Sequence, residues 1–205
     1  MPRNPDIILA SSSSTRKSQL AKLGLEFTCK SPNIDETQKN NEQPSALVIR
    51  LSIEKAKIIA KTNPHKIIIA GDQVMQVGMY TLGKPKTQDR AVEQLSLCSG
   101  KKAIFYTGIC LIDDNNNLYT SITTTEVKFK KLANKDIEKY IQSDDPLNCA
   151  GSIQVESKGL LLIEEIRSND PYAVLGLPTT ELSKLFNKAG LDLLEMCKPG
   201  SPIID

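Results

Sequence analysis

Short apolar runs alternate with amphipathic stretches along most of this chain. Runs rich in Ile, Val, Leu and Thr predict strands at 6–10, 66–71, 103–112, 119–129 and 159–166. Helical periodicity, with several starts at Ser, Thr or Pro, predicts helices at 14–23, 45–62, 87–97, 134–142 and 179–189. The Asp- and Asn-rich segment from Asp113 to Asn117 is typical of a hairpin turn. Because hairpin and crossover connections coexist, the pattern predicts an α/β protein with a mixed sheet.

Length and composition exclude several classes of protein. The 205 residues suit one domain, and neither a repeat nor a linker interrupts them. A net charge of +2 argues against a nucleic-acid binder or a polybasic membrane anchor. The apolar runs are too short to cross a bilayer, and the N-terminus lacks the pattern of a signal peptide.

The cysteines and the histidine restrict the chemistry further. Five scattered cysteines without a CxxC pair favour reduced thiols and a cytoplasmic location. The only histidine, His65, excludes a zinc site or a proton relay built on several histidines.

The segment 7–24, IILASSSSTRKSQLAKLG, is the most informative stretch for function. It predicts a buried strand, a hydroxyl-rich turn and a short helix. The free N–H groups of the helix N-terminus, with Arg16 and Lys17, would form a site for an anion such as phosphate. The alternative is that Ser13 or Ser14 only caps a helix whose cations are solvated.

Three further positions carry charged groups that could act in a site. Asp35 and Glu36 are adjacent carboxylates in a polar loop, and they are either solvated or part of a cation site. Lys55 projects from the apolar stripe of helix 45–62, so it either extends to the surface or turns towards an anion. Asp72 follows Gly71 at the carboxyl end of a buried strand, where open α/β sheets place ligands. It either binds metal, acts as a general base or opens a turn.

Two glycine-containing segments complete the set of candidates. Residues 78–85, GMYTLGKP, nearly match a P-loop, but Pro85 has neither the hydroxyl nor the N–H that a P-loop needs. Lys84 remains a possible phosphate contact. Residues 149–156, CAGSIQVE, form a small-residue loop that ends in the carboxylate of Glu156.

Taken together, these motifs resemble the Maf family of nucleotide pyrophosphatases. The resemblance rests on ASSSSTRK, the Asp35–Glu36 pair, EKAK around Lys55, AGDQ at 70–73, LGKP at 82–85, YTG at 106–108, CAGS at 149–152 and VLGLP at 174–178. It implies a Maf fold related to inosine triphosphate pyrophosphatases, with a long twisted mixed sheet, flanking helices and a cleft between two lobes. The expected organisation is one domain over 1–205, with a core at 6–190 and a tail at 191–205.

Within the family the chain looks most like the 7-methyl-GTP pyrophosphatases, because of Gln73 and Glu156. The branch acting on dTTP and UTP typically has Thr and Gln at these two places. The sequence also departs from the SxSPxRR pattern, with Ser14 in place of Pro, Lys17 in place of Arg, and Thr15 in place of the Trp of the 7-methyl-GTP branch. Loss of the tryptophan removes an aromatic ring that could stack on a cationic base.

The resemblance implies hydrolysis of a nucleoside triphosphate between its α and β phosphates. Asp72 is expected to be the general base, and Glu36 and Asp72 are expected to bind a divalent cation, Mg²⁺ or Mn²⁺. The expected phosphate-binding residues are Ser11, Ser13, Arg16, Lys55 and Lys84, and the expected base-specificity residues are Thr15, Gln73 and Glu156.

The expected partner is a small nucleotide, with no nucleic acid or membrane, and the resemblance suggests a homodimer. Two other functions stay open, a dTTP/UTP pyrophosphatase of the same family and a non-catalytic nucleotide-binding regulator of cell division.

Overall fold

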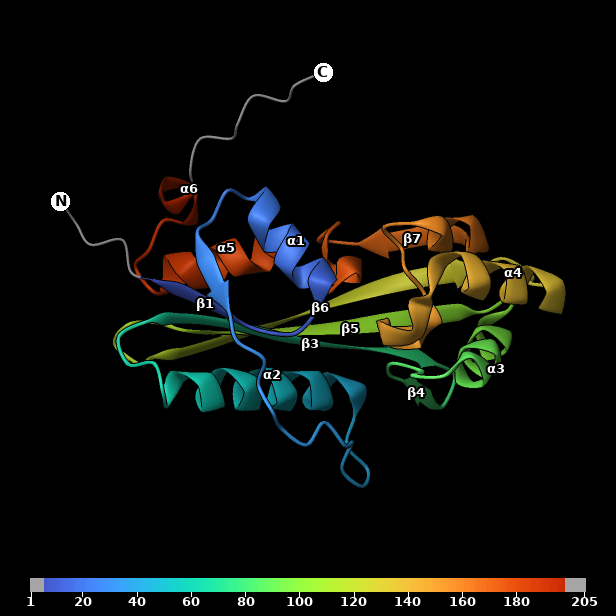
Figure 1. The fold of residues 1–205 in the computed structure, drawn as a ribbon, viewed down its shortest axis with the longest axis horizontal. Coiled ribbons are helices and arrows are strands. Elements are labelled where there is room, and N and C mark those ends of the chain that lie inside the picture. The colour runs from blue at the N-terminus through green and yellow to red at the C-terminus, as the bar shows by residue number, and fades with distance from the viewer. Residues whose placement is uncertain (1–5, 198–205) are drawn as a thin grey trace, which may run out of the picture.

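A long mixed sheet of seven strands organises the chain in the computed structural model, which describes residues 6–197 (Figure 1). The hydrogen-bonded order is β2-β1-β3-β5-β6-β7, and β4 pairs with β3 beside this path. β1 pairs in parallel with β2 and β3, and every other pair is antiparallel. The strands are β1 (Ile7–Ala10), β2 (Phe27–Cys29), β3 (Ile67–Val77), β4 (Tyr80–Leu82), β5 (Lys102–Ile112), β6 (Leu118–Phe129) and β7 (Ile163–Ser168). The predicted mixed α/β sheet is therefore confirmed.

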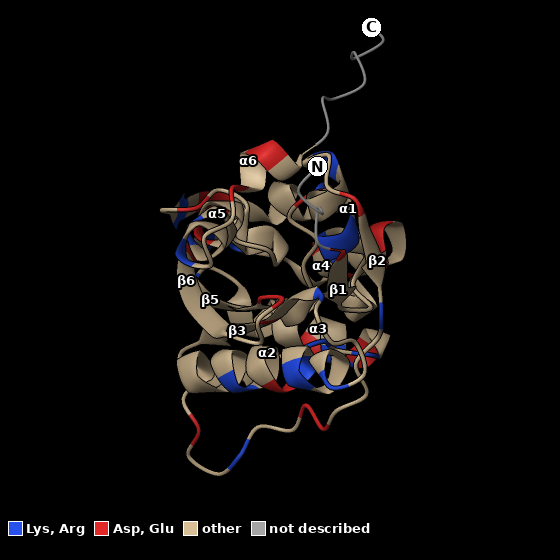
Figure 2. Cartoon of the chain, turned by 90° about the vertical axis from the view of Figure 1, so that its left-hand side faces the viewer, with Lys and Arg blue, Asp and Glu red and all other residues tan. Residues whose placement is uncertain are grey.

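Helices cover both faces of this sheet. α2 (Pro44–Ala60) lies along one face, and α1 (Ser14–Lys22) and α5 (Thr179–Lys188) lie on the other (Figures 1 and 2). α3 (Gln88–Cys98) and α4 (Asn134–Asp144) pack together at the far end, and α6 (Leu193–Met196) follows α5. Four 3₁₀ turns lie late in the chain: η1 (Pro146–Asn148), η2 (Ala150–Ser152), η3 (Lys158–Leu162) and η4 (Ala173–Leu175).

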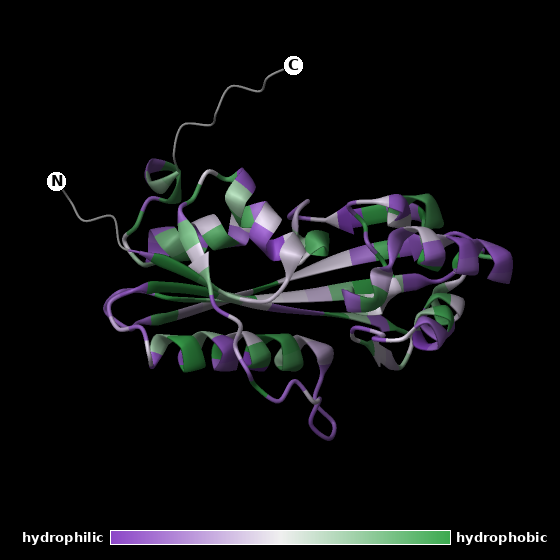
Figure 3. Cartoon of the chain, in the orientation of Figure 1, coloured by the Kyte–Doolittle hydropathy of each residue, from purple (hydrophilic) through white to green (hydrophobic). Residues whose placement is uncertain are grey.

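The buried apolar side chains form separate clusters at the two ends of the sheet. One cluster joins α3 and α4 to the distal parts of β3, β5 and β6, with Phe105 and Phe129 at its centre. A second joins α1 and α5 to β1, and a third packs the end of α2 under the same strands. In Figure 3 the hydrophobic colour is concentrated in the strands and in helix faces beside them, whereas the loop before α2 is largely hydrophilic. The two ends of the sheet thus form the two lobes of the predicted fold.

All five predicted helices are confirmed to within two residues at each end, but the strand predictions were less accurate. The predicted strand 66–71 was too short, because β3 continues to Val77 along β5 and β4. The predicted strand 159–166 was partly wrong, because residues 158–162 form η3 and the strand runs from Ile163 to Ser168. β2 and β4 were missed, because three residues are too few to show a period and only pairing with a neighbouring strand defines them.

The predicted position of Asp72 at the end of a strand was also wrong. Asp72 lies in the middle of β3, opposite Gly108 of β5. The parallel pairing of β1 with β3, however, ends at Ala10 and Ala70, and only the antiparallel pairing continues beyond. Asp72 is therefore placed just past the carboxyl end of the parallel part of the sheet, where the turn after β1 can lie beside it.

A close contact between α2 and β5 sets the height of α2 above the sheet. A Cβ atom built on Gly108 would lie 2.7 Å from the carbonyl oxygen of Val48. The hydroxyl of Ser52 donates to the carbonyls of both Val48 (2.6 Å) and Gly108 (3.0 Å). Because Gly108 faces Asp72 across the strand pair, this contact brings the next turn of α2, which carries Lys55, over Asp72.

None of the helices that the structure describes has the length and apolar character of a membrane span. Of the expected tail, residues 191–197 contain α6, whose Leu193 packs into the cluster around α5, and residues 198–205 lie outside the described part of the chain. The expectation of one domain over 1–205 stays a prediction.

We expect Gly108→Ala to lower the free energy of unfolding by about 1–3 kcal/mol, because α2 must move away from β5 to admit the methyl group. Urea denaturation measures this change. Gly83→Ala is the control, since its Cβ would meet no atom within 4 Å. Equal stability of the two variants would contradict the close contact.

Candidate active site

The ammonium group of Lys55 joins two carboxylates at the centre of the molecule. Its Nζ lies 2.6 Å from Oδ1 of Asp72 in β3 and 2.6 Å from Oε1 of Glu36 in the loop before α2. Lys55 and Asp72 are buried, whereas the side chain of Glu36 is 48% exposed. Lys55 therefore does not extend to the surface but turns towards anions, which are the carboxylates of Asp72 and Glu36.

The charges around Glu36 favour its ionised form. Loss of hydration raises the pKa of Glu36, but the hydrogen bond and charge of Lys55 lower it, and the charges of Lys84 and Arg16 lower it further. The net result is a pKa below the ordinary value. Glu36 is thus a carboxylate at neutral pH, as its contact with Lys55 requires.

Arg16 occupies a buried position where the α1 N-terminus meets the loop 173–178. Its Nε donates to the carbonyl oxygen of Gly176 (2.7 Å), and its Nη1 donates to Oγ of Ser11 (3.5 Å). Burial lowers the pKa of Arg16, and the charges of Asp72 and Glu36 offset part of this effect. Arg16 is thus a fixed cation whose orientation is set by a backbone carbonyl before any ligand binds.

The serine turn before α1 caps the helix and also lines the cleft. Ser13 is the N-cap, and its Oγ accepts from the backbone N–H of Arg16 (3.3 Å). The N–H of Ser13 in turn donates to Oγ of Ser11 (3.1 Å). The capping alternative is therefore correct for Ser13, but Ser13, Thr15 and Arg16 also face the cleft. Lys17 is exposed and does not line it.

Lys84 lies across the cleft in the loop between β4 and α3. Loss of hydration lowers the pKa of Lys84, Glu36 raises it, and the nearby cations Arg16 and Lys55 lower it again. Three cations from distant parts of the sequence therefore share one electrostatic environment. Such a group suits a ligand with several negative charges.

Gln73 and Glu156 also line the cleft, and each has a hydrogen-bond acceptor free. Nε2 of Gln73 donates to Oγ1 of Thr107 (2.9 Å) and to the carbonyls of Ala173 (3.0 Å) and Val174 (3.1 Å). All three partners are acceptors, so they fix the amide orientation and leave Oε1 of Gln73 for a ligand. Oε1 of Glu156 accepts from the hydroxyl of Thr15 (2.9 Å), which leaves its Oε2 available.

These groups line one cleft between the two lobes. It contains most of the predicted site residues together with parts of two loops, and its lining is Ser13, Thr15, Arg16, Asp72, Gln73, Lys84, Asn148, Cys149, Ala150, Ile153, Glu156, Val174, Leu175 and Gly176. Lys55 and Glu36 are not in this lining, but Lys55 contacts Asp72, which is part of it, and Glu36 contacts Lys55. No aromatic side chain is among the described residues of this lining.

Asp35 is separate from the site, although it is adjacent to Glu36. Its side chain is exposed, and Oδ1 accepts from the N–H of Thr37 (2.9 Å). This turn lowers the pKa of Asp35, chiefly through its hydrogen bonds with Thr37. Asp35 shapes the loop, and Glu36 is the carboxylate of the two that contacts Lys55.

Sequence reasoning missed the residues that hold the loop 170–178 in place. The buried carboxylate of Asp170 accepts from the N–H groups of Tyr172 (3.0 Å) and Thr180 (2.7 Å), so it joins this loop to the start of α5. No local capping pattern indicated this role, because Asp170 lies ten residues before Thr180. Nothing in the sequence could predict the contact of Arg16 with Gly176, because every residue has a carbonyl oxygen.

The carboxylate pair is compatible with a divalent cation that arrives with its ligand. Among the described residues, no group of three or more His, Cys, Asp or Glu side chains is arranged to hold a metal ion. Mg²⁺ commonly takes one or two protein carboxylates and completes its shell with phosphate oxygens and water. Glu36 and Asp72 fit this mode of binding and do not fit a permanent all-protein site.

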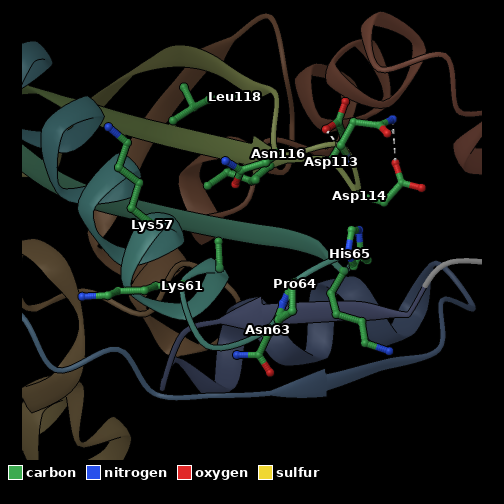
Figure 4. Close-up of a pocket in the computed structure, with 13 residues that line it drawn as sticks. Lys57, Lys61, Asn63, Pro64, His65, Asp113, Asp114, Asn116 and Leu118 are labelled. Carbon is green, nitrogen blue, oxygen red and sulfur yellow. Dashed lines mark hydrogen bonds between the residues drawn. The ribbon is translucent and has the colours of Figure 1, made fainter.

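A larger hollow lies at the end of the sheet where β3 begins and β5 ends (Figure 4). Its lining includes Lys57, Lys61, His65 and Asp114. Figure 4 shows the amino groups of Lys57 and Lys61 extending away from His65 and Asp114 on the other side. Because these charged groups do not converge on a common point, we assign no chemistry to this hollow.

Comparisons with known proteins agree with this geometry. A family model described as "Maf-like protein" matches residues 6–189. A protein of Nitrosococcus oceani named 7-methyl-GTP pyrophosphatase is 41% identical over 94% of this chain and 98% of its own length. A protein of Colwellia psychrerythraea with the same name is 42% identical over 92% of this chain and 94% of its own.

A solved structure shows the same fold at low identity. A HAM1 protein from Coxiella burnetii superposes with a TM-score of 0.52 and 18% identity, over 90% of this chain and 99% of the other.

The chain belongs to the Maf family. The predicted class of enzyme, a nucleotide pyrophosphatase, is confirmed by these relatives.

The thiol of Cys149 offers a test of the cleft environment that needs no activity. Burial, reinforced by Glu156, raises the pKa of Cys149 to about 11. We therefore expect its alkylation by iodoacetamide at pH 7 to be roughly two orders of magnitude slower than that of a free thiol, since only thiolate reacts. The rate should rise with pH up to about 11. Peptide mass spectrometry measures it, with exposed Cys29 as internal reference. Modification of Cys149 at pH 7 as fast as a free thiol would contradict the structure.

Proposed function

We propose that this enzyme hydrolyses 7-methyl-GTP to 7-methyl-GMP and pyrophosphate. The observation that carries the proposal is one cleft lined both by cations and by two side chains with free hydrogen-bond acceptors, Gln73 and Glu156. The cations suit a triphosphate, and the acceptors suit a base edge rich in donors. The relatives from N. oceani and C. psychrerythraea that carry this name support the same substrate.

The phosphate end would bind through groups already held in place. Arg16, Lys55 and Lys84 would neutralise the phosphate charges, and Ser11 and Ser13 would add hydroxyl contacts beside the α1 N-terminus. Glu36 and Asp72 would hold Mg²⁺ or Mn²⁺, which when bound would neutralise phosphate charge. These fixed charges lower the cost of bringing a nucleophile to an anionic phosphorus.

Asp72 would act as the general base on the attacking water. Its Oδ1 is held by Lys55, and its Oδ2 has no hydrogen-bond partner among the described residues. A buried carboxylate with one bound oxygen and one free oxygen is oriented to accept a proton from water. The proton moves to Oδ2, and the hydroxide that remains attacks the α-phosphorus as pyrophosphate leaves.

The free acceptor atoms of Gln73 and Glu156 would select guanine. Guanine offers adjacent N1–H and N2–H donors, which Oε2 of Glu156 and Oε1 of Gln73 can accept. Uracil and thymine place two carbonyl oxygens beside a single N3–H, and these oxygens would be repelled by a carboxylate. The structure therefore gives the dTTP/UTP alternative less support.

Recognition of the 7-methyl group would differ from stacking on a tryptophan. Thr15 at that position donates to Glu156 and presents no aromatic surface. The positive charge of the methylated base would be favoured by the carboxylate of Glu156 alone. We accordingly expect a weaker preference for 7-methyl-GTP over GTP than an aromatic site would confer. A homodimer and a cytoplasmic location also stay predictions.

Pyrophosphate release from 7-methyl-GTP, GTP, UTP and dTTP with Mg²⁺ tests the substrate. We expect the two guanine nucleotides to be preferred, no turnover in excess chelator, and pyrophosphate as the main product.

Glu156→Gln should reduce the preference for guanine by about 1–3 kcal/mol, because an amide pairs poorly with two donors. Glu164→Gln, an exposed acid of β7, is the control. A preference for a pyrimidine, or γ-phosphate release, would refute the proposal.

We expect Asp72→Asn to reduce kcat about 10²–10⁴-fold, because an amide can still accept from Lys55 but cannot take a proton from water. Circular dichroism and nucleotide binding should change little. The matched control is Asp35→Asn, an exposed acid in the loop that carries Glu36. Turnover close to wild type in Asp72→Asn would remove Asp72 from the mechanism.

A further inference from the structure

The loop between β2 and α2 carries a functional carboxylate without regular secondary structure of its own. Residues 30–43 contain neither helix nor strand, and apart from Ile34 and Pro32 they are almost entirely polar. Ile34 packs against the apolar side chains of α2 and so anchors the loop just before Glu36. Such a loop would ordinarily sample many conformations, yet the Glu36 carboxylate lies 2.6 Å from Lys55.

Arg50 of α2 binds the part of this loop that follows Glu36. Its Nε and Nη2 donate to the two carboxylate oxygens of Glu42 at 2.6 and 2.9 Å. The same Nη2 donates to the carbonyl oxygen of Thr37 (3.0 Å), the residue next to Glu36. Oε2 of Glu42 also accepts from the N–H of Lys39 (3.0 Å). One guanidinium thus fixes both ends of the segment 37–42.

The pairing of Arg50 with Glu42 is stronger than an ordinary surface ion pair. The side chains are only 17% and 9% exposed, and both carboxylate oxygens are engaged by the planar fork. The hydrogen bonds from Arg50 are the main reason that the pKa of Glu42 is lowered to about 2. Glu42 is therefore ionised at neutral pH, as the pair requires.

Arg50 and Lys55 belong to the same helix, so α2 holds the loop at two points. Lys55 binds the Glu36 side chain, and Arg50 binds the backbone one residue later. Lys55 alone cannot define the position of Glu36 once phosphates compete for its ammonium group. The contact to Thr37, in contrast, lies outside the cleft lining and can persist when a ligand is bound.

We propose that the Arg50–Glu42 pair is a positioning device that keeps Glu36 over Lys55 and Asp72 during turnover. This inference rests on the role of Glu36 in the proposed function. Only arginine can serve here, because the ammonium group of a lysine cannot bind both oxygens of Glu42 and the carbonyl of Thr37 in one plane.

Kinetics of Arg50→Lys and Glu42→Gln test the proposal, on whichever nucleotide the wild type hydrolyses. We expect kcat/KM to fall about tenfold in each variant, the range typical for residues that orient a ligand-binding group. The same substitutions made in a Glu36→Gln background should cause no further loss, because the residue that they position is already disabled. Glu54→Gln is the control, since it removes the exposed partner of Arg50 that has no contact with the loop. A full additional loss in the Glu36→Gln background would overturn the proposal.

Hydrogen exchange of the free protein provides a second readout that needs no activity. Residues 36–42 should exchange faster in Arg50→Lys and Glu42→Gln than in the wild type or in Glu54→Gln, while α2 and the sheet keep their protection. Unchanged exchange of this segment would overturn the positioning role. Absence of nucleotide hydrolysis by the wild type would instead refute the proposed function, and the exchange result would still decide whether the pair orders the loop.

Discussion

The contact of Lys55 with two carboxylates is the interaction on which the site depends. It joins the loop before α2, the helix itself and the centre of β3 at one ammonium group. A buried charge without partners would be costly, so the two carboxylates stabilise a lysine on an otherwise apolar helix face. The same arrangement holds both carboxylates beside the cleft that Arg16 and Lys84 line.

This contact is possible only because of how closely α2 approaches the sheet. Gly108 has no side chain, so the backbone at Val48 packs directly on β5, and Ser52 bonds across the contact. A larger residue at position 108 would raise α2 and move Lys55 away from Asp72. The packing of α2 and the contact of Lys55 with Asp72 therefore depend on a position that has no side chain.

The charged and the uncharged groups of the cleft are held by different physical means. The cations are oriented by backbone carbonyls and carboxylates, as Gly176 orients Arg16. Gln73 and Glu156 each have one polar atom fixed by protein contacts and an acceptor left free. The contact of Thr15 with Glu156 connects the α1 N-terminus to the loop that carries Glu156.

The sequence by itself determined the helices, the mixed α/β class and the family, because periodicity, caps and ordered motifs are local properties. It also identified Arg16, Lys55, Asp72 and Lys84 as the charged residues of interest. It could not show whether Glu36 is solvated or paired, nor find Arg50, because each depends on a partner brought near only by packing. Long-range strand pairing likewise placed Asp72 inside β3, since the continuation to Val77 is defined by β5 and β4. Tertiary structure alone decided which polar atoms were already paired, and so which remained free for a ligand.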